Sequence, residues 1–392
     1  MQRMRILFLT DSLSDLDGVG RYAVRLIGAL EELVPGLEVH VLLARKHRPT
    51  SSAVPKHWQV EVALPPDYFF YMNRPRFLAN LVPAVLRVAR AARKADLVHA
   101  IKDYPHNYAG LLGARIAGKP CIATAHGTYT IQPLLDRRHA ARAARAYRRF
   151  AALICVSGHT RDRLFDLLGQ GELPRERVHV IPNAVDAEHY RAQRELGPRA
   201  WHGVPFTLAI GELKERKGHH LSLAAWCRVA ARHRTLEHFV IGKLGGDEYE
   251  ARLRSLVDQA GLSERVHFLG NVSEDEKIDL LQRAQLFVHT PVDAADGGFE
   301  GFGLVYLEAA ASGTPSIGTR GSGAEDAIVD GQSGLLVEPT IEAVSAALER
   351  LLEDAGLRER MRIAGRELAL HSSWAENAQA VLALYREALQ RR

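Results

Sequence analysis

The sequence predicts an α/β protein with two doubly wound domains, each a parallel sheet with helices on both faces. Short apolar or β-branched runs alternate with amphipathic stretches along the 392 residues, an order typical of parallel sheets. The runs form two series, separated by residues 183–205, a segment with two prolines and mixed charge. A chain of this length also exceeds what one small core requires. Two domains are therefore expected.

The predicted strands of the first series are residues 5–10, 39–44, 97–100, 121–124, 152–156 and 178–181. Those of the second series are residues 206–211, 238–241, 266–269, 286–289 and 315–318. Amphipathic stretches at residues 22–33, 79–93, 221–232, 249–260 and 374–390 are the main helix candidates.

These elements predict an N-terminal domain over residues 1–185 and a C-terminal domain over residues 200–373. The last helix, within residues 374–392, is expected to pack back on the first domain. Ligands of such folds bind outside the carboxyl ends of the strands, so a site in a central cleft between the domains is expected.

The composition is that of an ordinary globular protein, with 47% hydrophobic and 25% charged residues. The apolar run near the N-terminus is too short for a signal peptide, and no stretch approaches about 18 apolar residues. The three cysteines, Cys121, Cys155 and Cys227, lie far apart in apolar surroundings and are expected to be reduced core residues. A cytoplasmic protein is expected.

The charge is divided unevenly between the two halves of the chain. Residues 1–182 hold 27 Lys and Arg against 15 Asp and Glu, and the remainder holds 24 against 31. Arginines recur at spacings of three and four over residues 137–149, which predicts a helix with a cationic stripe. The stripe is either a solvated surface or a contact for anionic lipid headgroups. Nucleic acid is not an expected partner, because no binding motif accompanies the stripe.

Four consecutive aromatic residues stand within residues 67–74, followed by Arg74 and Arg76. Such a run cannot alternate cleanly across a sheet. It forms either an exposed loop, lining an acceptor groove or dipping into lipid headgroups, or part of the core.

The stretch from Phe299 to Gly313 carries the clearest functional signal. Glu300 and Glu308 flank a Gly-Phe-Gly turn that opens an apolar helix. A glycine turn at a helix start can offer backbone N–H groups to an anion, whereas the Glu308 carboxylate suits hydroxyl groups. The pattern favours a nucleotide-sugar pocket; the alternative is a buried helix start with one satisfied and one solvated glutamate.

A dinucleotide fingerprint is absent. Gly18 and Gly20 follow the first strand in what reads as a long loop, without a third glycine. Hydride transfer is therefore not expected.

Several segments together resemble the retaining glycosyltransferases of family 4, which have the GT-B fold of two Rossmann-like domains facing a central cleft. The likeness spans almost the whole chain. It rests on Gly18-Val-Gly20, His126-Gly127, Val156-Ser157, Ile181 to Asp186, Gly211 to Gly218, Glu300 to Gly313, and Gly331 to Val337.

The resemblance implies a catalytic set of His126, Glu300 and Lys217. His126 would contact the donor sugar, Glu300 would lie by the transferred sugar, and Lys217 would stabilise the leaving diphosphate. Glu308 would contact the ribose. The other implied donor-binding positions are Gly18, Gly20, Gly211, Asn271 and the amides near Phe302, Gly303 and Leu304.

Two positions depart from the family pattern: Glu212 stands where an arginine is usual, and Ala184 where a glycine is usual. Glu212 is expected to point away or be paired, and Lys214 or Arg216 to supply the missing positive charge. No D-x-D pair is present, and the resemblance implies that neither a metal nor another cofactor is needed.

The predicted function is transfer of a hexose or N-acetylhexosamine from a UDP- or GDP-linked sugar, with retention of configuration. The expected acceptor is a lipid-linked glycan of cell-surface polysaccharide assembly, at the inner face of the membrane. The alternatives are a small soluble acceptor, a sugar-nucleotide epimerase, and a catalytically silent GT-B partner subunit.

Overall fold

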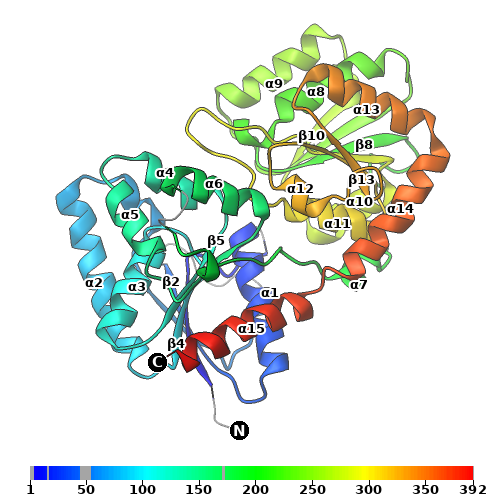
Figure 1. Ribbon diagram of the computed structural model, residues 1–392. Coiled ribbons are helices and arrows are strands. Elements are labelled where there is room, and N and C mark those ends of the chain that lie inside the picture. The colour runs from blue at the N-terminus through cyan, green and yellow to red at the C-terminus, as the bar shows by residue number, and fades with distance from the viewer. Residues whose placement is uncertain (1–3, 16, 45–53, 170–172, 392) are drawn as a thin grey trace. The chain divides into compact units, whose positions relative to one another are not determined.

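The computed structural model describes residues 4–15, 17–44, 54–169 and 173–391 (Figure 1). The chain divides into two compact units. Unit 1 is Met1–Asn183 together with Trp374–Arg392, and unit 2 is Ala184–Ser373. Each unit is an α/β domain with a parallel sheet, as the alternation of strand and helix patterns predicts.

The sheet of unit 1 has the strand order β3-β2-β1-β4-β5-β6-β7, with every pair parallel. Its strands are β1 (Arg5–Thr10), β2 (Glu38–Ala44), β3 (Gln59–Leu64), β4 (Leu97–Ala100), β5 (Cys121–Ala125), β6 (Ala152–Cys155) and β7 (Val178–Val180). Its helices are α1 (Gly18–Leu33), α2 (Arg74–Ala92), α3 (His106–Ile116), α4 (Thr128–Leu135), α5 (Ala140–Tyr147), α6 (Gly158–Leu168) and α15 (Trp374–Gln390).

The sheet of unit 2 has the order β10-β9-β8-β11-β12-β13, also parallel throughout. Its strands are β8 (Phe206–Ile210), β9 (Glu237–Ile241), β10 (Val266–Gly270), β11 (Leu286–Val288), β12 (Ser316–Thr319) and β13 (Gly334–Val337). Its helices are α7 (Ala187–Arg191), α8 (His219–Ala230), α9 (Glu248–Gln259), α10 (Glu274–Arg283), α11 (Leu304–Ser312), α12 (Ala324–Ala327), α13 (Ile341–Glu353) and α14 (Ala355–Leu370).

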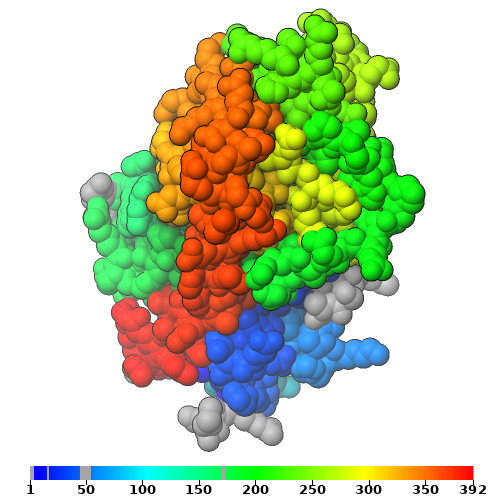
Figure 2. Space-filling view, turned by 90° about the vertical axis from the view of Figure 1, so that its right-hand side faces the viewer, coloured from blue at the N-terminus to red at the C-terminus, as the bar shows by residue number. Residues whose placement is uncertain are grey.

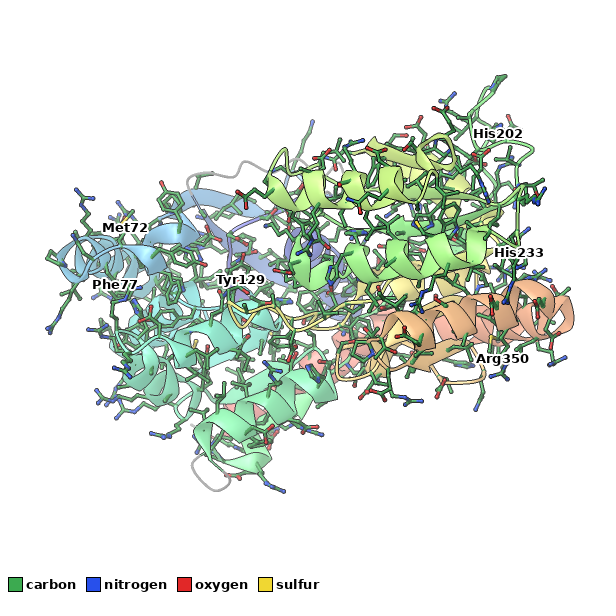
Figure 3. The ribbon with its side chains drawn as sticks, turned by 90° about the horizontal axis from the view of Figure 1, so that it is seen from above. Met72, Phe77, Tyr129, His202, His233 and Arg350 are labelled. Atoms are coloured by element: carbon green, nitrogen blue, oxygen red, sulfur yellow. The ribbon has the colours of Figure 1, made fainter. Side chains whose placement is uncertain are left out.

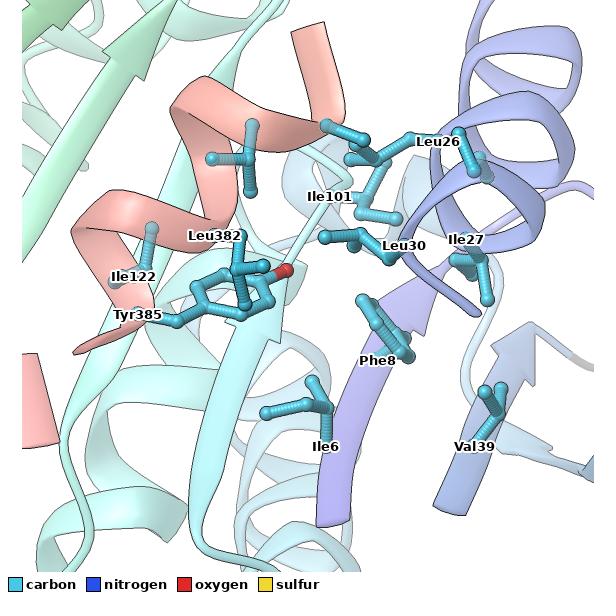
Figure 4. Close-up of a cluster of buried hydrophobic side chains, with 14 of the residues drawn as sticks. Ile6, Phe8, Leu26, Ile27, Leu30, Val39, Ile101, Ile122, Leu382 and Tyr385 are labelled. Atoms are coloured by element: carbon cyan, nitrogen blue, oxygen red, sulfur yellow. The ribbon is translucent and has the colours of Figure 1, made fainter. Parts of the chain in front are cut away.

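The last helix completes the core of unit 1. Leu382 and Tyr385 of α15 lie in one buried cluster with Leu26 and Leu30 of α1 and with Phe8 of β1 (Figure 4). The red C-terminal helix lies beside the blue N-terminal segment in Figure 2 as well. Burying a large apolar side chain contributes about 1.5–3 kcal/mol, so α15 is held mainly by packing.

Buried hydrogen bonds also fix the orientation of α15 on the sheet. The Tyr385 hydroxyl lies 2.6 Å from His99 Nδ1, and His99 Nε2 lies 2.8 Å from Thr124 Oγ1. Burial lowers the pKa of His99 to about 3, so the ring is neutral near pH 7. The helix is thus bonded to β4 and, through the ring, to β5.

Two strands and one helix start are missed by the sequence pattern. β3 is an edge strand with mostly solvent-accessible side chains, and its polar–apolar alternation is overlooked because it is not a continuous apolar run. β13 is a short strand that follows a glycine turn. The expectation of a long loop at Gly18 and Gly20 is wrong. Helix α1 begins at Gly18, because the Asp17 carboxylate accepts a hydrogen bond of 2.7 Å from the Gly20 amide and caps the helix.

The structure of the basic segment and of the aromatic segment differs from the simple sequence expectation. Residues 137–149 span the turn between α4 and α5 and the short helix α5, so the predicted helix is confirmed only over Ala140–Tyr147, where it carries Arg142 and Arg145. The aromatic run forms a 3₁₀ turn, Asp67–Tyr71, with Phe69 and Phe70 buried and Tyr68 and Tyr71 exposed. Figure 3 shows Met72 and Phe77 where this segment enters α2. Core packing and an exposed surface are therefore both present.

No helix among the described residues is both long and apolar enough to span a bilayer. The cysteines are unpaired thiols; Cys121 and Cys155 are buried, and Cys227 is only partly so.

Candidate functional site

The predicted phosphate-binding lysine lies on a loop at the carboxyl end of β8. Gly211 follows that strand, and a 3₁₀ turn, Glu215–Lys217, leads to Gly218 at the start of α8. Gly218 has φ +69°, and a Cβ there would lie 1.6 Å from the Thr290 carbonyl oxygen. The Thr290 hydroxyl donates to the Gly218 carbonyl oxygen at 2.9 Å. Only glycine fits at this position, and the loop is fastened to the end of β11.

Lys217 is ion-paired with Glu300, which comes from the loop before α11. The same carboxylate oxygen, Oε2, lies 3.5 Å from His289 Nε2 and 3.7 Å from Arg216 Nη1. Burial raises the pKa of Glu300, but Lys217, His289 and Arg216 outweigh it, so the net pKa lies well below its usual range. Glu300 is therefore an ionised carboxylate that is surrounded by an ammonium, a guanidinium and an imidazole group.

Glu212, the residue that replaces an expected arginine, is paired as predicted. Its carboxylate lies 3.0 Å from Lys214 Nζ. Arg216, the other candidate for the missing positive charge, faces Glu300 instead. The pairing with Lys214 neutralises the unusual glutamate, and Arg216 together with Lys217 supplies cations beside Glu300.

The helix start after Glu300 has the geometry that anion binding requires. Gly303 has φ +83°, and a Cβ there would lie 2.7 Å from the Tyr306 ring and 3.7 Å from Glu300 Cγ. The following helix, α11, begins at Leu304, and the first N–H groups of a helix have no partner within it. Phe302 is buried against this turn. The amides of Gly303 and Leu304 thus stand beside the Lys217–Glu300 pair, at the positive end of the helix dipole.

Glu308 lies in the same helix, about 6 Å further along its axis. Its carboxylate is 3% exposed and lies 3.2 Å from Lys277 Nζ of α10. Lys277 also lies 3.0 Å from a Glu274 oxygen and donates to the Tyr190 hydroxyl at 2.9 Å. The alternative of a solvated second glutamate is therefore wrong: both carboxylates are buried, and each is paired with a lysine.

The remaining predicted positions of unit 2 lie at the ends of neighbouring strands. Gly211, with φ +156°, accepts through its carbonyl oxygen from His219 Nε2 at 3.2 Å. Asn271 is exposed in the turn after β10. Within the described ranges, no hydrogen bond or ion pair joins Asn271 to Lys217, Glu300 or Glu308. Its expected role at the nucleobase stays a prediction.

In unit 1, His126 follows β5, at the carboxyl edge of the sheet. Its Nε2 lies 2.9 Å from the Ile101 carbonyl oxygen, and its backbone N–H donates to Asp103 Oδ1 at 3.2 Å. A carbonyl can only accept, so Nε2 carries the proton and Nδ1 holds the lone pair of the neutral ring. Burial lowers the pKa of His126, although the nearby Asp103 opposes this. The ring is neutral near pH 7.

Gly18 and Gly20, predicted to approach the donor, stand in the first turn of α1. A Cβ at Gly20 would lie 2.6 Å from the backbone of Ser14, so the loop after β1 already requires a glycine there. This packing accounts for Gly20 without a ligand, and a donor contact at either glycine stays a prediction.

Further charged groups near the His126 edge carry no motif and are missed by sequence reasoning. Lys102 is buried and lies 2.7 Å from Asp11 Oδ2, with its ammonium 4.9 Å from the centre of the Tyr129 ring. Burial opposes protonation, but Asp11 and its acidic neighbours outweigh it and raise the pKa of Lys102. Sequence reasoning also misses three residues of unit 2, namely Lys277, His289 and Tyr190, because no motif contains them. Only His289 gives a signal, because it ends a predicted strand.

No group of three or more His, Cys, Asp or Glu side chains among the described residues is arranged to hold a metal ion. Ser157 caps α6 by accepting from the Thr160 amide at 2.9 Å, a structural role. Asp186 caps α7 in the same way.

Two family models match the chain, one in each half. "Glycosyltransferase Family 4" matches residues 16–189, and "Glycosyl transferases group 1" matches residues 198–368. The second match contains Lys217, Glu300 and Glu308, and the first contains His126.

Three curated proteins illustrate the range of relatives. A glycogen synthase of Mycobacterium tuberculosis is 28% identical over 305 residues, 74% of this chain and 69% of that protein. A GDP-mannose-dependent alpha-(1-6)-phosphatidylinositol monomannoside mannosyltransferase of Mycolicibacterium smegmatis is 27% identical over 278 residues, 67% and 68% of the two chains. A D-inositol 3-phosphate glycosyltransferase of an Arthrobacter species is 28% identical over 401 residues, 96% and 91%.

The fold matches solved glycosyltransferases over the full length. The Anabaena protein Alr3699/HepE, crystallised with UDP-glucose, superposes with a TM-score of 0.76 at 21% identity, covering 100% of both chains. The two parallel-sheet units, and the lysine with two glutamates around a helix start, are the features that the family resemblance predicts. Both family matches point to the same family. The chain belongs to the GT-B glycosyltransferases of family 4, group 1, and is a glycosyltransferase.

Proposed function

We propose that this enzyme transfers a hexose or N-acetylhexosamine from a UDP- or GDP-linked sugar to a lipid-linked glycan, with retention of configuration and without a metal. The observation that carries the proposal is the convergence of Lys217, Glu300 and the Gly303 turn at one edge of the unit 2 sheet. It combines an ammonium, an ionised carboxylate and the amides of a helix start.

The diphosphate of the donor fits the cationic side of this cluster. Its oxygens would accept from the amides of Gly303 and Leu304 and share Lys217 with Glu300. As the sugar–phosphate bond breaks, negative charge grows on the leaving phosphate, where Lys217 and Arg216 stabilise it. Two cations at this point supply the charge that a metal ion provides in other transferases, which supports metal independence.

The sugar and the ribose fit the carboxylates. Glu300 is ionised and fixed by Lys217, His289 and Arg216, so it can accept hydrogen bonds from sugar hydroxyls. Glu308, held by Lys277, can accept from the ribose hydroxyls. We assign His126 of unit 1 to the donor sugar, where its neutral ring can orient a hydroxyl through Nδ1. Retention by double displacement would need a nucleophile on the protein, and we assign none. We therefore favour attack by the acceptor on the same face of the sugar that the diphosphate leaves.

A surface of unit 1 supports the lipid-linked acceptor and a peripheral position on the membrane. The apolar side chains of Leu78, Val82 and Leu86 recur every fourth residue along α2 and are 39%, 53% and 60% exposed. The arginines Arg74, Arg76, Arg90 and Arg93 of the same segment are exposed too. Tyr68 and Tyr71 stand just before the helix. Apolar, aromatic and basic side chains on one element are typical of binding to an anionic bilayer surface.

The relatives support both a lipid and a soluble acceptor. The mycobacterial mannosyltransferase is described as acting on a phosphatidylinositol monomannoside, and the Arthrobacter enzyme as acting on D-inositol 3-phosphate. We favour the lipid because of the α2 surface. The soluble acceptor is the second candidate.

The proposal is tested with the full-length protein and radiolabelled UDP-glucose, UDP-N-acetylglucosamine and GDP-mannose. Each is offered with a membrane lipid extract or with soluble sugars and inositol phosphates, with and without EDTA. We expect label to enter the organic phase at an unchanged rate with EDTA, and NMR to show that the donor's anomeric configuration is kept. Label only in soluble product would favour the second candidate. An inverted product, or loss of activity with EDTA that added metal restores, would contradict the mechanism.

A further inference from the structure

A basic cavity of about 750 Å³ lies in unit 1, and His126 is not among the residues that line it. It is lined by the end of α3, the end of α5, the segments that precede β5, β6 and β7, and the end of α15. Pro120, Ala151 and Arg177 each lie at or just before the start of a strand. The cavity therefore opens at the amino edge of the sheet. His126 follows the other end of β5, about 16 Å away along a five-residue strand.

The cavity wall is strongly cationic. Six of its lining side chains are Arg115, Lys119, Arg145, Arg148, Arg149 and Arg177, and Arg391 is a seventh. No Asp or Glu is among the described residues that line it. Its floor is made of small or apolar groups such as Cys121 and Ala146, both buried.

Most of this charge is not neutralised by neighbours. Arg391 is paired with Glu387. By contrast, Arg115, Lys119, Arg145, Arg149 and Arg177 form no ion pair within the part of the chain that the structure describes. An isolated cluster of like charges destabilises a folded domain through mutual repulsion.

Helix dipoles account for part of the cluster. The carboxyl ends of α3, α5 and α15 meet at this edge, and each is equivalent to roughly −0.5 of a charge. Leaving out Arg148 and Arg391, five cations still exceed the three helix ends by more than about three charges. A surface that only balanced its helix ends would need fewer cations.

We propose that this cavity binds a compact anion with two or more phosphate groups. Its volume is that of a small-molecule site. Its arginines project from several elements around a concave wall, so they can contact one ligand from different sides. Guanidinium groups pair with phosphate oxygens in a bidentate manner. The cavity is built by residues of unit 1 alone, whereas Lys217 and the Gly303 turn belong to unit 2, so its ligand is a second anion, separate from the donor's diphosphate.

The same chemistry is offered by a free polyphosphate and by the phosphate headgroups of an anionic lipid. The test therefore has one arm for each source. Both arms use the full-length chain and the double variant Arg115→Glu/Arg145→Glu, whose two side chains are exposed. The matched control is Arg137→Glu/Arg234→Glu, which makes the same charge change at exposed positions outside the cavity.

In the first arm, inorganic tripolyphosphate is titrated by calorimetry in a Lys217→Ala background, which removes the donor-site lysine. We expect saturable binding that weakens at least about tenfold in the cavity variant and less than about twofold in the control. Hydrogen exchange should show protection of residues 108–119 and 145–151 on binding. Absence of saturable binding by the parent protein, or equal weakening in both variants, would overturn the proposal.

In the second arm, the proteins are sedimented with phosphatidylcholine vesicles that contain phosphatidylglycerol or cardiolipin. If the lipid is the source, the cavity variant sediments at least about tenfold less and tripolyphosphate competes. If the anion is soluble, both variants sediment alike while the tripolyphosphate titration still separates them. Loss of vesicle binding in the cavity variant supports a lipid headgroup as the ligand. Loss of tripolyphosphate binding alone supports a soluble anion.

Discussion

Lys217 and Glu300 form a partly buried ion pair across 83 residues of sequence. The lysine is carried by a glycine-constrained loop after β8, and the glutamate by the loop that opens α11. The pair fixes an ammonium beside the amides of a helix start, where a diphosphate can be bound from two sides. It also keeps Glu300 ionised and oriented before a sugar is present.

Replacing this lysine tests the leaving-group role. Lys217→Ala should lower kcat about 100- to 1000-fold, because one preorganised charge on the leaving phosphate is lost. The measurement is the initial rate of radiolabel transfer at saturating donor. Lys243→Ala is the control, because Lys243 is exposed in the loop after β9 and its loss leaves the Glu212–Lys214 pair intact; its kcat should stay within about threefold. Comparable losses in both variants would show that loop charge in general, and not Lys217, supports catalysis.

Replacing Glu308 tests binding of the nucleotide separately from the transfer step. Glu308→Gln keeps the shape of the side chain but removes its charge, and charge-assisted hydrogen bonds contribute about 1.5–3 kcal/mol. We expect the Kd of UDP or GDP to rise about 10- to 100-fold, measured by calorimetry, while Lys277 keeps its partner Glu274. The exposed Glu353→Gln is the control for net charge. An unchanged nucleotide Kd in Glu308→Gln would remove Glu308 from the ribose site.

The sequence predicts much of this site because its main features are local. The helix start after Glu300, the glycine at residue 218 and the strand ends before Gly211 and His126 all follow from short patterns. Eleven predicted strands exist in the structure within a residue or two of their predicted bounds.

The features that could not be predicted are set by tertiary contacts. Lys277 reaches Glu308 from another helix, and nothing in its own segment marks it. β3 is a different case, because Val60, Val62 and Leu64 alternate with Gln59 and Glu61, so its own segment does carry a strand pattern. The start of α1 depends on the Asp17 cap, which a loop-like Gly-Val-Gly sequence conceals. The Lys217–Glu300 pair is likewise invisible, because each residue alone fits a ligand contact.

Two glycines with similar positive φ values separate the steric demand on the lysine loop from the cost of the backbone conformation. Gly218 and Gly203 have φ values of +69° and +86°, but only Gly218 faces another atom, the Thr290 oxygen, at 1.6 Å from an added Cβ. Gly203→Ala should cost about 1 kcal/mol for the left-handed conformation alone. Gly218→Ala should cost more than about 3 kcal/mol and abolish nucleotide binding. Urea unfolding of the full chain measures both, and equal costs would contradict the packing of this loop against β11.

Acid should destabilise the protein through its buried neutral histidines. Burial lowers the pKa of His99 to about 3, and those of His219 and His238 likewise, against 6.5 in the unfolded chain. Below pH 6.5 the unfolded chain takes up protons that the folded chain does not, so stability falls as the pH drops from 6.5 towards 3. Above pH 6.5 these groups have no effect.

Each such histidine should lower the free energy of unfolding by about 2 kcal/mol at pH 5 relative to pH 7. His99→Gln should reduce the difference between the two pH values by that amount, measured from urea unfolding of unit 1. Leu135→Gln, at an exposed and non-titrating position of the same unit, should leave the difference unchanged. Equal pH sensitivity of wild type and His99→Gln would mean that folding does not lower the pKa of His99.

The exposed apolar row of α2 provides the test of membrane association. Leu78, Val82 and Leu86 replaced together by Gln should weaken binding to phosphatidylglycerol vesicles at least about tenfold, because three apolar side chains lose burial in the bilayer interface. Cosedimentation at low and high salt measures this, and the remaining binding should fall with salt because the arginines persist. The control replaces Val329, Ile363 and Leu370, exposed apolar residues of unit 2, by Gln. If that control loses vesicle binding to the same extent, or if the α2 variant loses transfer to soluble acceptors as well, the α2 surface does not dock the enzyme on lipid.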